Sequence, residues 1–205
     1  MPRKSVAPQR RDQIVQALFE CLAEKGHERV TVKDIAEKAN LHYGVIHYYF
    51  KSKDDIVTAM ADSIISRYER LLVERLQPAN TVTEKLQASI DFLVDEFIFN
   101  RRLNRVFYNL VQMAFERKTV RAALRKQIRE YRGFLAEEMK DGISNGEFAP
   151  HEPKEFASLM VAVVEGMALQ WMIEPKTLNS KNVRTLIQSV VNKHLNHTHE
   201  RDAGI

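Results

Sequence analysis

Residues 31–53 have the sequence TVKDIAEKANLHYGVIHYYFKSK, which contains two short amphipathic segments. Thr31 and Asp34 form the pattern of a capping box, so a helix is expected to begin at this point. Asn40 tolerates the left-handed conformation that ends many helices, and a second helix is expected over residues 43–49. Two short helices joined by a tight turn have the proportions of a helix-turn-helix.

The same residues resemble the DNA-binding signature of the tetracycline-repressor (TetR) family. The resemblance covers about a quarter of the chain and implies a head that binds double-stranded DNA. Three positions depart from the pattern, because the family usually has Gly at Asn40, Ser or Thr at His42 and Tyr at His47. The resemblance therefore does not specify the operator sequence. The matching positions are Thr31, Ile35, Ala36, Ala39, Gly44, Ile46, Tyr49, Phe50 and Lys53.

Basic residues are concentrated at the amino end of the chain. Residues 1–53 contain ten basic and six acidic side chains, which account for the whole formal net charge of +4. A basic head on a neutral body is typical of phosphate binding, but a solvated surface would have the same composition. Arg3, Lys4, Arg10 and Arg11 are expected either to follow the DNA backbone or minor groove, or to make no contact.

Apolar residues recur at helical spacing along the rest of the chain. The 7 glycines and 6 prolines are about half the usual share, which also favours helices. We expect an all-α fold of about nine helices, with a helix-turn-helix DNA-binding domain over residues 1–53. Residues 54–205 are expected to form a larger ligand-binding and dimerisation domain. The expected helices lie between Pro8 and Lys25, Thr31 and Asn40, Tyr43 and Tyr49, Ser52 and Pro78, Thr81 and Phe97, Leu103 and Ala114, Thr119 and Asn145, Pro153 and Pro175, and Ser180 and Leu195.

The helix expected over residues 43–49 is short enough to lie with its first turn in the major groove. Tyr43 is expected to hydrogen-bond a base edge or a phosphate, and Val45 to contact a thymine methyl group. Gly44 has no side chain, so the backbone can approach the DNA closely there. Lys33 is expected to reach a base or the adjacent strand. The chemistry of the side chains, together with the family resemblance, assigns phosphate contacts to Thr31, His47, Tyr48 and Lys53.

Aromatic and methionine side chains are frequent in the expected helices five to eight. At helical spacing they are usually core residues, but together they would suit a cavity for an apolar or cationic small molecule. Glu165 lies in an otherwise apolar helix, so its carboxylate should meet either a structural partner or a ligand. The pair Glu165-Gly166, followed by Leu169-Gln170, resembles the choline-responsive BetI-like branch of the family. The candidate ligand-binding residues are Phe92, Phe107, Tyr108, Tyr131, Glu165 and Trp171.

The last two expected helices are the candidate dimer surface. The helix after Pro153 is apolar on more than one face and must be covered, and the helix after Ser180 has one apolar stripe. The resemblance implies a homodimer through these helices, with two recognition helices about 34 Å apart on a palindromic operator. A small-molecule effector would release the DNA by tilting the helix that follows residue 53.

These features indicate a homodimeric repressor, and they do not indicate an enzyme. The alternative is a helical-bundle small-molecule-binding protein or enzyme with an incidental basic head. The chain has no Gly-rich phosphate loop and no His-Glu-x-x-His motif, and Cys21 has no evident His partner, so no catalytic residue or cofactor is expected.

Metal binding and membrane insertion are not expected either. His194, His197 and His199 are not spaced as a helical set of metal ligands. The chain shows no signal-peptide pattern and no uninterrupted apolar run of about 18 residues, which favours a cytoplasmic protein without membrane contact.

Overall fold

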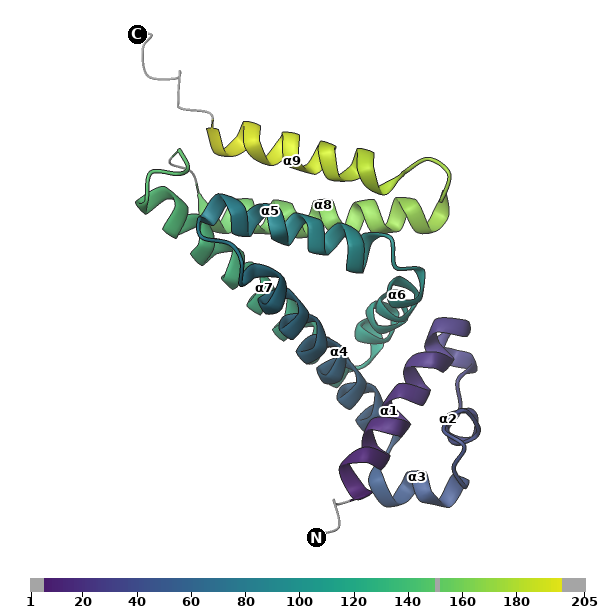
Figure 1. Ribbon diagram of the computed structural model, residues 1–205. Helices are drawn as coiled ribbons and strands as arrows, with labels where there is room; N and C mark the ends of the chain where they lie inside the picture. The colour runs from purple at the N-terminus through teal and green to yellow at the C-terminus, as the bar shows by residue number, and fades with distance from the viewer. Residues whose placement is uncertain (1–5, 150–151, 197–205) are drawn as a thin grey trace. The chain divides into compact units, whose positions relative to one another are not determined.

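The computed structural model describes residues 6–149 and 152–196, and within them no strand occurs (Figure 1). The expected all-α class is confirmed. The α-helices are α1 (Val6–Glu24), α2 (Val32–Lys38), α3 (Tyr43–Tyr49), α4 (Lys53–Leu76), α5 (Val82–Leu93), α6 (Arg101–Glu116), α7 (Lys118–Ser144), α8 (Pro153–Ile173) and α9 (Ser180–Asn196). Two shorter elements are the 3-10 helix η1 (His27–Arg29) and the π-helical turn η2 (Val94–Ile98).

The chain divides into two compact units. Unit 1 contains Met1–Glu69 and Arg105–Gln127, and unit 2 contains Arg70–Asn104 and Ile128–Ile205. Helices α4, α6 and α7 therefore have residues in both units. The helix-turn-helix segment belongs to a unit that also includes most of α6 and the beginning of α7.

Helix α2 begins where its capping residues place it. The backbone N–H of Asp34 donates to Thr31 Oγ1 at 3.1 Å, and the N–H of Thr31 donates to Asp34 Oδ2 at 2.6 Å. These two bonds complete the capping box predicted from the sequence. They satisfy backbone donors that have no partner within the first turn of a helix.

The turn between α2 and α3 is built around Asn40. Its φ of 52° is the single positive value at a non-glycine residue in the described part of the chain. The N–H of Asn40 donates to Glu37 O, and the N–H of Leu41 donates to Ala36 O at 2.9 Å. These bonds form a Schellman motif, and they confirm that Asn40 ends α2.

The core of unit 1 anchors α3 by one side only. Ile46 and Phe50 are 1% and 3% exposed and face inward. Because these residues are buried, the opposite side of α3 is left to solvent. Other members of this core are Ile14, Leu18, Leu22, Ile35, Ile56, Met60, Val106, Leu110 and Met113.

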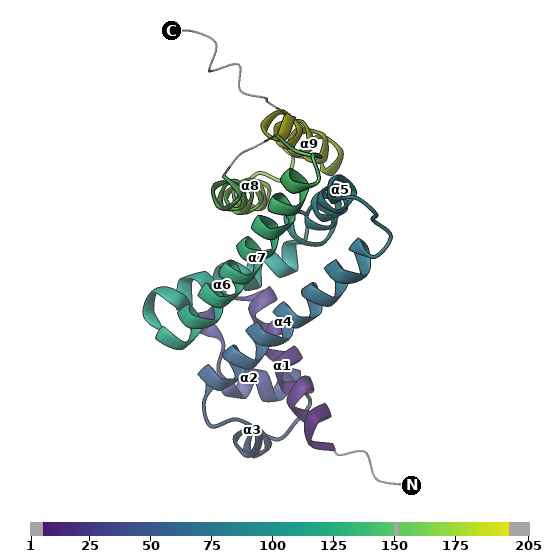
Figure 2. The same cartoon turned by 90° about the vertical axis from the view of Figure 1, so that its left-hand side faces the viewer.

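Unit 2 has its own core, formed by α5, η2, α7, α8 and α9. Figure 2 shows α8 and α9 next to each other in this unit. The helix expected to reach Phe97 ends at Leu93 instead, and the chain continues as η2. The core includes Leu86, Ile90, Val94, Ile98, Leu135, Met139, Phe156, Met160, Val164, Val183, Ile187 and Val191.

Candidate functional site

The exposed side of α3 carries most of the residues that the sequence assigned to DNA. α3 lies at the surface of unit 1 beside α2 (Figure 2). Tyr43, Gly44, His47 and Tyr48 are exposed, and Val45 is half-buried. The rings of Tyr43 and His47 meet edge-on at 4.8 Å, so the first residue of α3 is supported from the next turn. This arrangement can present a base-reading helix to a groove.

His42 forms the N-cap of α3. Its Nδ1 accepts a hydrogen bond from the backbone N–H of Gly44 at 3.3 Å. This bond satisfies one of the backbone donors that have no partner within the first turn of a helix. The start of α3 is therefore capped by an imidazole.

The start of α2 lies beside this helix and is also exposed. Lys33 points to solvent, whereas the hydroxyl of Thr31 is engaged in the capping box and donates to Asp34 Oδ2 at 2.7 Å. The bonds from Thr31 and the ion pair with Lys25 at 2.9 Å hold the pKa of Asp34 far below its usual range. Asp34 is therefore ionised at neutral pH, with Lys25 balancing its charge.

The ammonium group of Lys53 is directed at the backbone of unit 1. It donates to the carbonyl oxygen of His27 at 2.9 Å and also to the carbonyl oxygen of Val30. The pKa of Lys53 is lowered mainly by its partial burial and, to a smaller extent, by the positive charge of Arg117 nearby. The next residue of α4, Asp54, forms an ion pair with Arg117, so the start of α4 is tied to two other parts of unit 1.

Two further basic side chains, Lys51 and Arg11, lie near α3 and were not assigned a definite DNA contact from the sequence. Lys51 is exposed in the turn between α3 and α4. Its place beside Lys53, in a short basic stretch, is the feature of the sequence that could have identified it. Arg11 donates to Tyr49 O at 2.6 Å, and its guanidinium lies 4.2 Å from the centre of the Phe50 ring. Arg11 therefore supports the end of α3. Arg3 and Lys4 lie outside the described residues.

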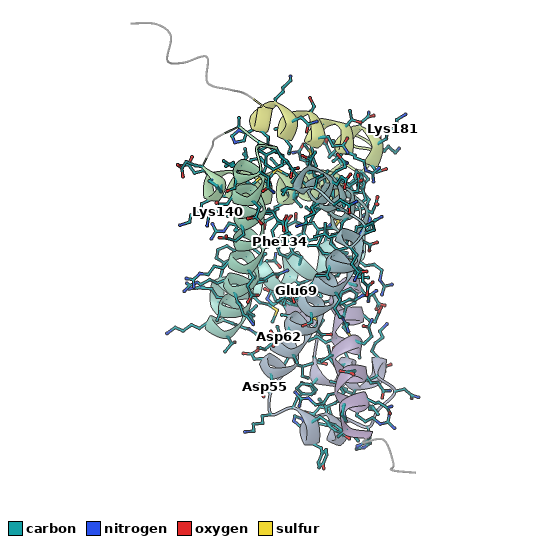
Figure 3. The ribbon with its side chains drawn as sticks, turned by 60° about the vertical axis from the view of Figure 1, so that its left-hand side comes forward. Asp55, Asp62, Glu69, Phe134, Lys140 and Lys181 are labelled. Atoms are coloured by element: carbon teal, nitrogen blue, oxygen red, sulfur yellow. The ribbon has the colours of Figure 1, made fainter. Side chains whose placement is uncertain are left out.

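Acidic side chains mark the edge of this interface. Figure 3 shows Asp55, Asp62 and Glu69 following one another along α4, and all three are exposed. A row of carboxylates repels phosphate groups. These carboxylates lie on α4, whereas Lys33 on α2 and Lys51 in the turn before α4 are exposed cations.

Four of the six candidate ligand-binding residues belong to unit 2. Trp171 contacts Phe99 at 5.3 Å between ring centres, and the guanidinium of Arg101 lies 5.4 Å from its ring. The hydroxyl of Tyr131 is buried, and it has no hydrogen-bond partner among the described residues. Burial raises the pKa of both Tyr131 and Glu165. Phe92 is buried.

The other two candidates, Phe107 and Tyr108, belong to unit 1. Their rings meet edge-on at 5.6 Å between centres, and both side chains are half-buried. Phe99 and Arg101 were not among the ligand-binding residues predicted from the sequence. Both contact Trp171, but they lie about 70 residues before it in the chain, so no local sequence pattern indicates these contacts.

An apolar groove runs between α8 and α9 in unit 2. Leu159, Leu186 and Val190 are exposed along it, and His194 stacks on Phe156 at its end. α8 is long and apolar enough to cross a membrane, by length and composition only, and many core helices of soluble proteins share this property. The groove is lined by Phe156, Leu159, Met160, Val163, Met167, Leu186, Ile187, Val190, Val191 and His194.

An ion-pair network in unit 2 joins α9 to α5, η2 and α4. Arg184 approaches Asp91 at 2.7 Å and Asp95 at 2.6 Å. Arg75 pairs with the other oxygen of Asp95 at 3.1 Å. Basic side chains of α9 and α4 therefore pair with the carboxylates of Asp91 on α5 and Asp95 on η2.

The described residues contain no cluster of three or more His, Cys, Asp or Glu side chains that could hold a metal ion. His197 and His199 lie outside the described residues. Cys21 is buried, and burial raises the pKa of its thiol. A thiol with a raised pKa is a poor nucleophile at neutral pH.

Comparison with known proteins gives two family matches that together span most of the chain. Residues 14–60 match the family described as "Bacterial regulatory proteins, tetR family". Residues 82–196 match the family described as "BetI-type transcriptional repressor, C-terminal".

Individual relatives agree with these matches. The chain is 32% identical over 108 residues to the HTH-type transcriptional regulator BetI of Stenotrophomonas maltophilia, a match that spans 52% of this chain and 55% of that protein. It is 23% identical over 210 residues to BetI of Klebsiella pneumoniae, with 95% and 98% covered.

Solved structures share the fold. A transcriptional regulator from Saccharomonospora viridis in complex with choline has a TM-score of 0.85 at 17% identity, with 93% of this chain and 100% of that chain covered. The regulator FadR from Bacillus subtilis in complex with stearoyl-CoA has a TM-score of 0.77 at 22% identity, with 92% and 99% covered.

Proposed function

Because the chain belongs to the TetR family of bacterial regulatory proteins and has a BetI-type repressor C-terminal domain, we propose that it represses genes as a homodimer on a palindromic operator and is released by a small molecule. It is a DNA-binding transcriptional regulator, and the relatives described above are regulators, not enzymes. Because bacterial regulators of this family act on DNA, we propose that it acts in the cytoplasm.

The observation that carries this proposal is the two-sided character of α3. Ile46 anchors the helix in the core, while Tyr43 and Gly44 face solvent in its first turn. A Tyr hydroxyl can donate to or accept from a base edge, and a helix without a side chain at its second position can approach the groove closely. Val45, at the rim of this turn, offers a methyl surface to thymine.

Phosphate contacts surround this base-reading turn. Lys33, His47 and Tyr48 are exposed and carry donors that suit phosphate oxygens. Thr31 contributes by fixing the start of α2, since its hydroxyl is engaged in the capping box. Lys53 is held by backbone carbonyls, so we assign the phosphate contact in this turn to Lys51.

The apolar groove between α8 and α9 supports a homodimer. Leu159, Leu169 and Ile173 of α8 and Leu186 and Val190 of α9 are all exposed in the single chain. Large apolar side chains exposed along a groove are typical of an interaction site. A two-fold contact of these helices with those of a second copy buries the surface of both chains at once.

The symmetry of the dimer determines the operator. A two-fold axis presents two α3 helices to one side of a duplex, so the half-sites are inverted repeats about one helical turn apart, roughly 34 Å. Neither copy alone reads both half-sites.

The effector region is proposed to combine aromatic surface with a carboxyl group. Trp171 supplies an aromatic face, and Glu165 supplies a carboxyl that can pair with a cation once it is ionised. The buried hydroxyl of Tyr131 can bond a ligand oxygen. Phe92 is proposed to add apolar lining within unit 2, whereas Phe107 and Tyr108 are proposed as ligand contacts within unit 1. The choline-bound neighbour makes a quaternary ammonium compound the first effector to test.

Selection from random duplexes tests the function directly. Wild-type protein is expected to enrich an inverted repeat, and its affinity for that repeat is expected to fall steeply with salt because phosphates are neutralised on binding. Choline, and in a separate arm stearoyl-CoA, is then added to the complex, and release of the DNA is measured.

The outcomes distinguish the parts of the proposal. A pool without an enriched sequence contradicts DNA binding by α3, and an enriched site without two-fold symmetry contradicts the homodimer. Release by stearoyl-CoA but not by choline contradicts the cationic effector and leaves the repressor intact.

A further inference from the structure

Helix α1 ends without a complete cap of its own. The last carbonyl groups of an α-helix have no partners inside the helix. The N–H of Lys25 donates to Cys21 O at 3.0 Å, but Gly26 has an extended backbone with φ −63° and ψ 150°. The left-handed turn that often closes a helix is therefore missing at this point. The end of α1 must find other donors.

Helix α6 supplies these donors within unit 1. Asn109 Nδ2 donates to the carbonyl oxygen of Leu22 at 3.1 Å, and Arg105 Nη2 donates to that of Glu24 at 3.0 Å. A cation at the end of α1 is also favoured by the helix dipole. Side chains more than 80 residues away thus complete the cap of α1.

Asn109 also holds His27, the first residue of η1. Its Oδ1 accepts from the backbone N–H of His27 at 2.6 Å, and its Nδ2 donates a further bond to Arg105 O at 2.9 Å. Asn109 is 8% exposed, and its bonds to His27 and Leu22 are buried. The amide accepts on one side and donates on the other, so its two ends cannot be exchanged without breaking bonds.

His27 is thereby held at both ends of its backbone. Its N–H is bonded to Asn109 of α6, and its carbonyl oxygen is bonded to Lys53 of α4. The loop continues through Val30, which Lys53 also contacts, to Thr31 at the start of α2. Hydrogen bonds to backbone are directional, so they define the position of this loop more narrowly than apolar packing does.

We propose that Asn109 is a positioning residue for operator binding. By holding Leu22 and His27 it sets where α2 begins, and through the turn at Asn40 it sets how α3 is presented to the groove. This proposal rests on the function proposed above, because its effect is measured as affinity for the operator. Asn109 itself lies on α6, outside the helix-turn-helix, and touches no DNA.

The test compares two substitutions at neighbouring positions of α6. N109L removes all the side-chain bonds while keeping a similar volume, and L110A removes packing from the same core while leaving the side chain of Asn109 and its hydrogen bonds in place. Both variants are measured at concentrations and temperatures where circular dichroism shows them folded. The readouts are affinity for the selected operator, affinity for a random duplex of equal length, and exchange of the His27 amide proton.

N109L is expected to lose about tenfold in operator affinity, comparable to one lost base contact, with less than about twofold change on the random duplex. L110A is expected to keep the wild-type preference, and only N109L is expected to exchange the His27 amide faster. If N109L does not fold, N109D replaces it, because Asp keeps the acceptor for His27 and loses the donor to Leu22.

Equal operator affinity in the Asn109 variant and in L110A would overturn the proposal. An equal loss on operator and random duplex would also overturn it, since a positioning role affects the specific complex. If the wild type itself selects no operator, the proposed function fails instead. The His27 exchange rate then still reports whether Asn109 holds the loop.

Discussion

The ammonium group of Lys53 donates a hydrogen bond to the backbone carbonyl oxygen of His27 at 2.9 Å. Lys53 opens α4 and His27 opens η1, so the bond joins two elements 26 residues apart in the chain. We expect Lys53→Met to lower the free energy of unfolding by about 1–3 kcal/mol, because buried carbonyls lose a charged donor. Urea denaturation measures this loss.

The matched control is Lys51→Met. Lys51 is exposed, so its removal should leave stability nearly unchanged and lower the salt slope of operator binding by about 0.9, the value for one phosphate on duplex DNA. If Lys53→Met lowers the slope and Lys51→Met does not, the two roles have been assigned the wrong way round.

Tyr43 is expected to read a base pair. Tyr43→Ala should relax the preference at one position of each half-site by about 1–3 kcal/mol. Tyr48, which is 82% exposed, is the comparison, because a phosphate contact carries no sequence information and its removal should weaken all duplexes alike. Competition binding against operators with single base changes separates the two. Unchanged discrimination in Tyr43→Ala argues against base reading by this residue.

Leu186 lies in the apolar groove between α8 and α9 and is 51% exposed in the single chain. Leu186→Glu should abolish the dimer, because the interface would bury a charge without a partner. Val73→Glu is the control, since Val73 is similarly exposed, at 60%, and lies on α4 outside the groove. Sedimentation velocity gives the assembly state. If Leu186→Glu remains a dimer and Val73→Glu becomes a monomer, the interface lies on α4 and not on the groove between α8 and α9.

Glu147 accepts hydrogen bonds from the backbone N–H groups of Thr83 and Val82, and these bonds lower its pKa from 4.5. A carboxyl whose pKa is lower in the folded state stabilises the fold above its unfolded value, and the contribution is lost as the pH falls through the folded value. Wild type should therefore lose stability below about pH 4.5 more steeply than Glu147→Gln. Thermal melts between pH 3 and 7 test this, and parallel curves would contradict it.

Glu165 has a raised pKa because it is partly buried. If a cation pairs with its carboxylate, choline affinity should rise with pH until Glu165 is fully ionised, and Glu165→Gln should remove that dependence. The stabilisation of the folded state by choline, measured as a shift of the melting temperature, reports the affinity. A choline shift of equal size in both proteins at every pH would exclude Glu165 from the site.

Features encoded by neighbouring residues were predicted correctly from the sequence. The capping box at Thr31 joins residues three apart, and Asn40 ends α2 through its own backbone. The family resemblance was likewise carried by a continuous stretch, and the family matches confirm it. Hydrogen bonds between residues close in the chain depend on few side chains, so caps and turns of this kind can be predicted from a single sequence.

Features that depend on distant residues were missed. Asn109 meets Leu22 across 87 residues, and Arg184 meets Asp95 across 89. Nothing in the local pattern of either segment indicates its partner, because the pairing is decided by how the helices pack. The π-helical turn after Leu93 was also missed, because the apolar spacing there fits an ordinary α-helix.

Unit 1 is assembled from two separate stretches of chain, and this limits how the protein can be recombined. A chimaera that grafts residues 1–69 onto a foreign sensor would carry the reading head without α6, and Leu22 and His27 would lose the amide that bonds them. Engineers who wish to exchange sensors between such regulators must transplant residues 105–127 as well, or choose a recipient whose sixth helix offers an equivalent side chain.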